Sequence, residues 1–301
     1  MRWMVTGAGG ALGQDLADVL SGTGEPVTAL TRAGLDVTDA DAVAAAVSAW
    51  AADRGDEPAV LLNAAAYTQV DRAETDADAR AAAVAANTDA PGHLATACAA
   101  VGARMVHVST DYVFPGDRTD GAGYEPDDTT GPLGVYGRTK ADGEQRVRDA
   151  LDAHHVVRTA WVYGGTGANF VATMARLSRE RDTLDVVDDQ HGSPTWSRDL
   201  ADALVALGRS DAAPGTLHAT GGGRTTWCGL ARAVFEELGA DPERVHPTTT
   251  DRFPRPAPRP AWSVLSDRSW RTTGLAPLRP WRDALSAAVR RHPGLLDPDR
   301  R

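Results

Sequence analysis

The sequence contains few cysteines and no long apolar run. Only Cys98 and Cys228 occur among its 301 residues, and they show neither CxxC nor Cys/His spacing. Neither a disulfide framework nor a zinc site is therefore predicted, and both thiols are expected to be small buried groups in a reducing compartment. No segment approaches the roughly 20 apolar residues that cross a bilayer, and no secretory leader is recognisable after Met1. We expect a cytoplasmic protein without a membrane partner.

Basic residues are also outnumbered. The chain has 31 Lys and Arg against 41 Asp and Glu, which gives a net charge of -10. Such a charge repels a polyanion at long range, so nucleic acid is not an expected partner, although a local basic pocket for one phosphorylated small ligand remains compatible with it. A hydrophobic content of 42% over this length is sufficient for a full α/β core.

The N-terminal half alternates short apolar runs with Ala-rich amphipathic stretches. Helices are predicted to begin near Ala11, Ala40, Asp76 and Val135. The predicted strands are Arg2 to Thr6, Pro26 to Leu30, Ala59 to Leu62, Arg104 to Ser109 and His155 to Thr159. This alternation favours βαβ units and a doubly wound parallel sheet of the Rossmann type, with ligands outside the carboxyl ends of the strands.

After about Val162 the alternation loosens into segments punctuated by Gly and Pro. Phe253 to Pro260 holds four prolines in eight residues and must be extended or looping. Helices are predicted at Phe170 to Arg179, Asp199 to Leu207, Thr226 to Leu238 and Trp281 to Arg290. We expect a dinucleotide-binding domain over residues 1–162 and a smaller substrate lobe mainly over residues 163–301, some of whose segments can return to the first domain.

A glycine-rich segment directly follows the first predicted strand. The run from Thr6 to Gly13 has the spacing TGxxGxxG and opens the first helix. Gly7 allows a tight turn, Gly10 allows the backbone to approach a pyrophosphate, and Gly13 allows close packing of the helix. Because a helix N-terminus attracts anions, this segment, including Ala11 and Leu12, is predicted to bind a dinucleotide.

The end of the second strand bears on the choice of cofactor. Sites that prefer NAD place an acid there, but this chain places Arg32 there, which favours NADPH with NADH tolerated. The less favoured alternative is that Arg32 is an ordinary solvated arginine. Asp36 and Val37 could bracket the adenine ring or precede a helix. The third strand ends in the small residues Asn63, Ala64 and Ala65, which would let a cofactor pass closely.

Tyr136 and Lys140 form a YxxxK pair at the head of a predicted helix. Their spacing of four places both side chains on one helix face. A phenol with a pKa of about 10 is a poor acid at neutral pH, and a nearby ammonium that stabilises phenolate would improve it. Thr110 and Asp111 follow another strand, where a hydroxyl can hydrogen-bond a carbonyl. These residues predict a site that can give a proton to a substrate carbonyl and hydrogen-bond it.

Seven segments distributed along the chain resemble one family. They are TGAGGALG, LLNAAAYTQVDRAE, HVSTDYVFPG, YGRTKADGE, RTAWVYG, DDQHGSPTWSRDLADAL and RPAWSVLSD. Together they resemble the extended short-chain dehydrogenases and, within them, the dTDP-4-dehydrorhamnose reductases. The resemblance implies that hydride passes from the nicotinamide to C4 of a dTDP-4-keto-6-deoxyhexose. Tyr136 would give the proton, Thr110 would polarise the carbonyl, and Lys140 would tune Tyr136 and hold the nicotinamide ribose.

The resemblance also implies a set of substrate contacts and a departure from some relatives. Arg259 would face the diphosphate or remain an ordinary surface residue, and Trp161 would pack on the sugar or belong to the core. The implied substrate contacts are Thr110, Asp111, Tyr136, Trp161, Asn169, Gln190, Thr195 and Arg259. Some relatives form dimers around a metal. Asp15 matches one such position, but no acid stands at Trp196 to Arg198, so no metal is expected, and monomer and homodimer both remain open.

Two further functions must be weighed. The same fold serves as a non-catalytic regulatory subunit of methionine adenosyltransferase, yet a pure binding module has no need of a hydroxyl, a phenol and an ammonium together. The dTDP-dihydrostreptose synthases of aminoglycoside pathways resemble the same subgroup, and composition and spacing do not separate them. Dehydratases of the superfamily typically follow the threonine with Asp-Glu, whereas Thr110 is followed by Asp111 and Tyr112.

Overall fold

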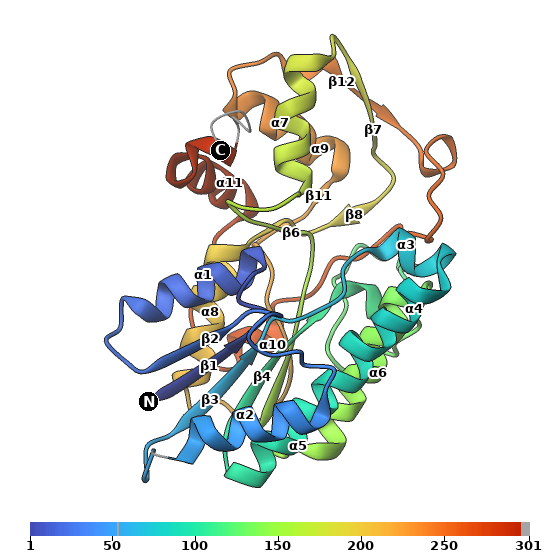
Figure 1. The fold of residues 1–301 in the computed structure, drawn as a ribbon. Helices are drawn as coiled ribbons and strands as arrows, with labels where there is room; N and C mark the ends of the chain where they lie inside the picture. Colours follow the sequence, from blue (N-terminus) through green and yellow to red (C-terminus); the bar gives the residue numbers. More distant parts are fainter. Residues whose placement is uncertain (53, 296–301) are drawn as a thin grey trace.

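A six-stranded parallel sheet forms the centre of the first lobe (Figure 1). The computed structural model describes residues 1–52 and 54–295. The strand order is β10-β5-β4-β3-β1-β2. Successive strands are added on one side of β1 up to β2 and on its other side from β3 onward, which creates a topological switch point between β1 and β3. The strands are β1 (Arg2–Thr6), β2 (Val27–Leu30), β3 (Ala59–Asn63), β4 (Arg104–Thr110), β5 (His154–Thr159) and β10 (Gly215–His218). The predicted α/β fold class is confirmed.

Helices cover both faces of this sheet. One face carries α1 (Ala11–Ser21) and α8 (Ser197–Arg209), and the other carries α2 (Ala40–Ala52), α5 (Ala90–Val101) and α6 (Val135–Ala150). Alternate residues of a strand point to opposite faces, so Trp3 and Val5 join the core under α1 and α8, while Met4 joins the core under α2 and α5. Burial on both faces explains why the strands read as continuous apolar runs.

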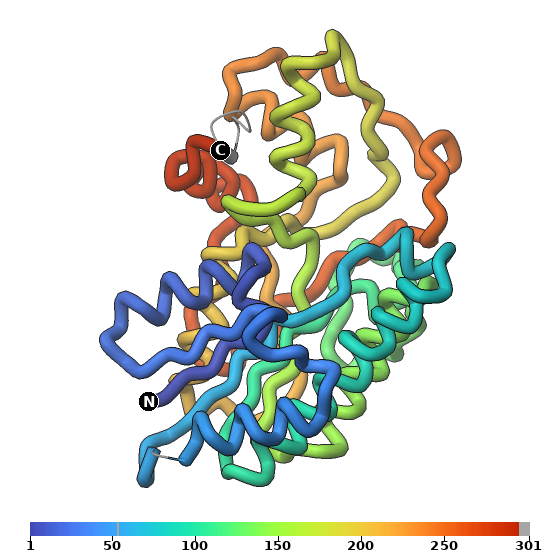
Figure 2. Tube along the Cα trace, viewed as in Figure 1, coloured from blue at the N-terminus to red at the C-terminus, as the bar shows by residue number. Residues whose placement is uncertain are grey.

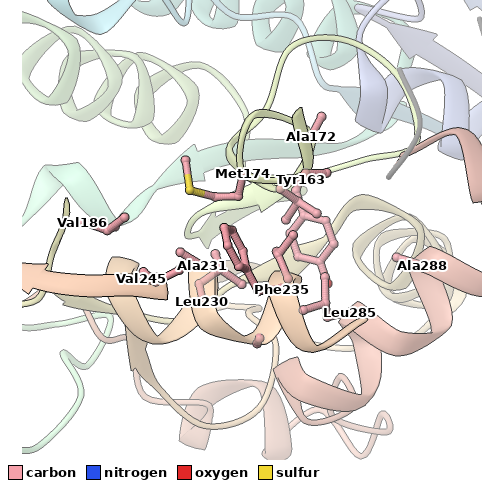
Figure 3. Packing of buried hydrophobic residues seen from close by; sticks show 14 of the residues in the cluster. Tyr163, Ala172, Met174, Val186, Leu230, Ala231, Phe235, Val245, Leu285 and Ala288 are labelled. Atoms are coloured by element: carbon pink, nitrogen blue, oxygen red, sulfur yellow. The ribbon is translucent and has the colours of Figure 1, made fainter. Parts of the chain in front are cut away.

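The second lobe is a smaller layer of helices and short strands with its own core. Its helices are α7 (Phe170–Glu180), α9 (Trp227–Glu237) and α11 (Trp281–Arg291). Figure 3 shows Phe235 packed among Met174, Leu230 and Leu285. The paired strands are β7 (Leu184–Val187) with β12 (Val245–Thr248), β6 (Val162–Tyr163) with β9 (Thr195–Trp196), and β8 (His191–Gly192) with β11 (Thr225–Thr226).

The chain returns to the first lobe after entering the second, as the tube in Figure 2 shows. Strand β10 pairs with β5 at the edge of the large sheet, and α8 packs against α1. A short helix, α10 (Arg268–Arg271), also contacts β10. The first lobe is therefore assembled from residues on both sides of residue 162. Both cysteines are buried and free, as expected. No helix within the described ranges is long and apolar enough to span a membrane.

The helix predicted to begin near Asp76 is confirmed, because a helix begins at Ala77, but the helical region around it is divided into four pieces. They are α3 (Val70–Thr75), α4 (Ala77–Val84), the π-helical turn η1 (Ala85–Asp89) and α5. The Asp76 carboxylate accepts hydrogen bonds from Asp78 N and Ala79 N, which makes Asp76 the cap of a new helix.

The 3-10 turns are η2 (Asp111–Val113), η3 (Pro242–Arg244), η4 (Thr250–Arg252) and η5 (Pro293–Leu295).

A buried ion pair fastens α6 to the sheet. Glu144 of α6 and Arg158 of β5 have 0% and 3% of their side chains exposed. Arg158 Nε and Nη2 donate to the two Glu144 carboxylate oxygens at 2.9 and 2.7 Å, and Ser109 Oγ of β4 donates at 2.6 Å. Burial raises the pKa of Glu144, but the hydrogen bonds and charge of Arg158 outweigh it, and the net pKa is lowered.

We expect Arg158→Ala to lower the free energy of unfolding by about 3 kcal/mol, because it leaves a buried carboxylate with Ser109 and the half-buried Arg148. Urea unfolding monitored by circular dichroism measures the change. Arg176→Ala is the matched control, since Arg176 pairs with Glu180 on an exposed surface, and its loss should be under about 1 kcal/mol. Equal losses in the two variants would show that the buried pair does not stabilise the fold.

The Glu144–Arg158 pair also predicts how the free energy of unfolding depends on pH. In the wild type, the lowered pKa of Glu144 contributes stability that is present above the unfolded pKa of about 4.3 and is lost as the pH falls through the folded pKa. In Arg158→Ala, burial with fewer partners raises the folded pKa, so Glu144 favours folding at low pH and opposes it as the pH rises.

Candidate active site

The glycine-rich loop lies at the switch point and packs against the end of β3. Gly7 has φ +75°, a conformation that L side chains rarely adopt, and a Cβ there would be 2.5 Å from Ala65 N. A Cβ on Gly13 would overlap the Gly7 carbonyl oxygen, so only glycine lets α1 approach the loop this closely. Gly10 has ordinary space around its Cα.

The N-terminus of α1 is available to an anion. Gly10 is its N-cap and provides no side-chain hydrogen bond to the first turn, which begins with Ala11 and Leu12. The first backbone N–H groups of a helix lack intrahelical partners and carry a partial positive charge. This end of α1 therefore fits the pyrophosphate of a dinucleotide, with Gly10 on the side where a ligand would approach.

Arg32 follows the end of β2 at Leu30, as predicted. Its side chain is 88% exposed and lies 3.7 Å from the Asp36 carboxylate. Asp36 Oδ1 accepts hydrogen bonds from Thr38 N and Thr38 Oγ1, which lower the pKa of Asp36. Val37 is half-buried against the core under α2. Arg32 is thus a solvated cation beside the switch point, held only by a surface ion pair.

A chain of buried polar contacts connects the glycine loop to Lys140. Thr6, Asn63 and His107 are neighbours across β1, β3 and β4. Thr6 Oγ1 donates to Asn63 Oδ1 at 2.8 Å, and Asn63 Nδ2 lies 3.0 Å from His107 Nδ1. Asn63 Oδ1 also accepts from Ala65 N at 3.1 Å. The glycine-rich loop and helix α6 are therefore connected through these side chains.

Lys140 is 2% exposed and closes this chain of contacts. Its Nζ donates to Val108 O at 2.6 Å and lies 3.4 Å from His107 Nε2. Burial lowers the pKa of Lys140 to about 8, against the charge of Glu144, which raises it. Burial, together with Lys140, lowers the pKa of His107 well below its ordinary value, so His107 is neutral.

Tyr136, Thr110 and Asp111 meet at the end of β4. Burial and the Asp111 carboxylate raise the pKa of Tyr136 to about 12, and a hydrogen bond with Thr110 opposes them. Thr110 Oγ1 lies 3.0 Å from Asp111 Oδ1, and burial raises the pKa of Asp111 to about 6. Tyr136 therefore holds its proton at neutral pH. Lys140, expected to stabilise its phenolate, is directed here at Val108 O and His107.

Two aromatic residues stack on each other beside the core of the second lobe. Trp161 has φ +48° and stacks on Trp227, with ring centroids 3.6 Å apart and planes inclined by 4°. Trp227 Nε1 donates to Gln190 Oε1 at 3.1 Å, and Gln190 Nε2 donates to Thr250 Oγ1 at 3.0 Å. A strained non-glycine residue at a site is held there by its surroundings. Here the stacked indole supplies part of that support.

The other predicted substrate residues have partners within the protein. Asn169 caps α7 by accepting from Ala172 N, and Thr195, which is fully buried, accepts from Gly221 N. Arg259 Nη2 lies 3.0 Å from Asp71 Oδ1 and is 15% exposed. The structure thus places Asn169 and Thr195 in the walls of the second lobe, whereas Arg259 lies close to the catalytic helix.

A cavity opens beside Tyr136 between the two lobes. Its lining includes Tyr112 and Gly137 from the first lobe and Ala257, Pro258 and Pro260 from the proline-rich segment. Among the described residues no cluster of three or more metal-ligating side chains occurs, and Asp15 accepts a hydrogen bond from Ser197. The arrangement brings the Tyr136 phenol and the Thr110 hydroxyl together, while the Lys140 ammonium lies on the chain of polar contacts that leads to the glycine loop.

Sequence reasoning did not single out several residues of this site. His107 lies within the quoted segment HVSTDYVFPG but reads as one more residue of a buried strand. Trp227 looks like a helix-starting aromatic residue, and Asp71 like a solvated acid. The alternation of His107 and Ser109 on one face of β4 was a usable signal, because that face lies under α6, where apolar residues are expected.

The fold and the site together define an extended short-chain dehydrogenase/reductase. The family described as RmlD substrate binding domain matches residues 1–293, and the chain belongs to that family. The resemblance drawn from the sequence motifs is confirmed.

Curated relatives and a solved structure agree with this assignment. A dTDP-4-dehydrorhamnose reductase of Streptomyces griseus is 51% identical over 95% of this chain and 92% of its own length. A probable dTDP-4,6-dihydroxy-2-methyloxan-3-one 4-ketoreductase of Streptomyces antibioticus is 51% identical over 96% and 94%. The crystal structure of dTDP-4-dehydrorhamnose reductase from Bacillus anthracis in complex with NADP has a TM-score of 0.89 and 33% identity, covering 96% of this chain and 99% of that one.

We expect Gly13→Ala to weaken NADPH binding by about tenfold to hundredfold, since its Cβ would push α1 away from the loop and overpacking costs about 1 to 3 kcal/mol. Fluorescence titration with NADPH measures the dissociation constant. Gly22→Ala is the control, because a Cβ at this end of α1 makes only an ordinary contact with Val19 O. An unchanged affinity in Gly13→Ala would mean that the loop tolerates displacement.

Proposed function

We propose that this protein is an NADPH-dependent reductase of the C4 keto group of a dTDP-4-keto-6-deoxyhexose, of the dTDP-4-dehydrorhamnose reductase type. The observation that carries the proposal is the contact of Tyr136 with Thr110 at the carboxyl end of β4, with Lys140 of the same helix joined through His107 and Asn63 to the end of β1, where the glycine loop begins. Ligands of doubly wound sheets bind at this edge. The family membership and the names of close relatives support the substrate class.

Bound NADPH supplies the hydride that reduces the ketone carbon. Thr110 Oγ1, which donates to Asp111 Oδ1 in this structure, turns its hydrogen to the carbonyl oxygen of the substrate and so stabilises the negative charge that develops there. Tyr136, with a pKa of about 12, transfers its phenolic proton to that oxygen, because an alkoxide is a stronger base than a phenolate. Lys140, whose ammonium donates to Val108 O in this structure, must turn toward Tyr136 to stabilise the resulting phenolate, and it holds the nicotinamide ribose.

The second lobe and the loop before Pro260 hold the nucleotide sugar. The Trp161 ring, fixed by Trp227, offers an apolar face to the deoxyhexose, and Gln190 adds a polar contact. Arg259 binds the diphosphate through paired charge-assisted hydrogen bonds. Asn169 and Thr195 stabilise the local backbone of this lobe by accepting hydrogen bonds from Ala172 N and Gly221 N.

A different 4-keto sugar is the second candidate substrate. The Streptomyces antibioticus relative, whose name specifies another 4-ketoreduction, is as similar to this chain as the Streptomyces griseus reductase. The dTDP-dihydrostreptose synthase reaction is a further member of this class. Assays with purified protein, NADPH and several dTDP-4-keto sugars, followed by identification of the products, distinguish these substrates. A regulatory subunit without turnover is disfavoured by the assembled phenol, hydroxyl and ammonium.

The compartment and the binding partners that we propose are argued from the composition of the chain. Two free, buried thiols suit a reducing cytoplasm. The acidic net charge disfavours nucleic acid as a partner. The dTDP-sugar and NADPH are therefore the partners that we propose, for either a monomer or a homodimer.

We expect Tyr136→Phe to reduce kcat by about 10² to 10⁴, because the variant lacks the proton donor but keeps the ring. NADPH affinity and the melting temperature should remain close to those of the wild type. Stopped-flow measurement of NADPH oxidation with the 4-keto sugar determines the effect. Turnover within a few fold of the wild type would exclude Tyr136 as the donor.

Arg32 is expected to select NADPH over NADH. The 2′-phosphate needs a cation and hydrogen-bond donors at the end of β2, and losing a guanidinium should lower kcat/KM for NADPH by about tenfold to hundredfold. The Arg32→Ala variant should retain its kcat/KM for NADH. Comparing both cofactors in wild type and variant provides the test, and a parallel loss with both would contradict a role in selection.

A further inference from the structure

Two acidic residues of the short helix α3 contact different parts of the active site. Asp71 and Glu74 lie three residues apart, which places them on one helix face. In Figure 1 the chain that follows β12 runs down from the second lobe and ends beside α3.

Glu74 supplies a cap to the catalytic helix from outside it. The N-cap residue of α6 is Gly134, which has no side chain to offer, and the Glu74 carboxylate accepts a hydrogen bond from Val135 N instead. A Cβ on Gly134 would overlap Glu74 Oε1, so the glycine makes room for this contact. A carboxylate is favoured at a helix N-terminus by the helix dipole. Val135 directly precedes Tyr136, so the contact fixes the backbone beside the proton donor.

Asp71 holds the proline-rich segment. Its Oδ1 accepts from Arg259 Nη2 at 3.0 Å and from Ala257 N at 3.2 Å, and its Oδ2 accepts from Arg255 Nε at 3.2 Å. Arg259 Nη1 in turn donates to Ala257 O at 3.0 Å. Burial raises the pKa of Asp71, but these hydrogen bonds and the arginine charges lower it overall, so Asp71 is ionised at neutral pH.

We propose that α3 is a positioning element that fixes the distance between the proton donor and the substrate diphosphate, with Glu74 setting the catalytic helix and Asp71 orienting Arg259. This inference rests on the proposed function, because it takes the ligand of Arg259 to be a nucleoside diphosphate. Arg259 donates one hydrogen bond from Nη2 to Asp71 and one from Nη1 to Ala257 O. Because a guanidinium carries several more N–H groups than these two bonds use, the same side chain can bind both the carboxylate and a diphosphate. Val70 of the same helix and Pro258 line the cavity beside Tyr136.

The two carboxylates should separate into different kinetic effects. Asp71→Asn should raise KM for the 4-keto nucleotide sugar and the dissociation constant for dTDP by about tenfold, with kcat and NADPH affinity changed by less than about twofold. Arg259→Ala provides the reference for complete loss of the diphosphate contact. Glu74→Ala should instead lower kcat by about tenfold to hundredfold, because the proton donor is misplaced. Glu74→Gln, whose amide oxygen can still accept from Val135 N, should recover most of that loss.

Asp78→Asn is the matched control, since Asp78 is an exposed acid on the neighbouring helix α4 and its substitution removes the same charge. Circular dichroism confirms that each variant is folded. The inference is overturned if Asp71→Asn behaves like Asp78→Asn, if it tightens dTDP binding, or if Glu74→Gln is as impaired as Glu74→Ala. A wild type that neither binds dTDP by calorimetry nor reduces any dTDP-4-keto sugar overturns the proposed function itself, and the inference with it.

Discussion

The active site depends on how α6 is seated on the sheet. Where a helix normally packs through apolar side chains, the C-terminal end of this sheet presents His107, Ser109 and Arg158, and α6 presents Lys140 and Glu144. Such a layer is stable only when every buried polar group is paired, because an unpaired charge in the interior costs several kcal/mol. In return, directional bonds fix the register of α6 more narrowly than apolar packing would.

This seating explains how one helix serves both ligands. Tyr136 lies at the start of α6, beside the proline-rich segment. Lys140 lies one turn further along the helix, where contacts through His107, Asn63 and Thr6 lead to the glycine loop. A displacement of α6 would therefore change the position of the proton donor and the cofactor loop together. Glu74 and the Asp71 contacts extend the same constraint to the segment that carries Arg259.

Burial shifts the pKa values of Tyr136 and Lys140 in opposite directions. It raises the pKa of Tyr136 to about 12, which keeps the phenol loaded with its proton, and it lowers the pKa of Lys140 to about 8. Asp111 adds to the first effect, since its charge disfavours a neighbouring phenolate. Tyr136 is therefore protonated at neutral pH, but the same burial makes its phenol a weaker acid.

The sequence by itself determined most of the first lobe and the glycine loop, because these depend on local patterns: buried parallel strands, helix periodicity, and the spacing TGxxGxxG. The spacing YxxxK predicts Tyr136 as the proton donor. Long helices such as α7 and α11 were also predicted to within a residue or two at their ends. Two-residue strands such as β6 and β9 were not predictable, since they are too short to show a period. Only the tertiary structure decided that residues 197–218 return to the sheet, that Trp227 supports Trp161, and that Asp71 and Glu74 contact Arg259 and α6. These contacts join residues far apart in the chain, and nothing in the local sequence around either partner encodes the other.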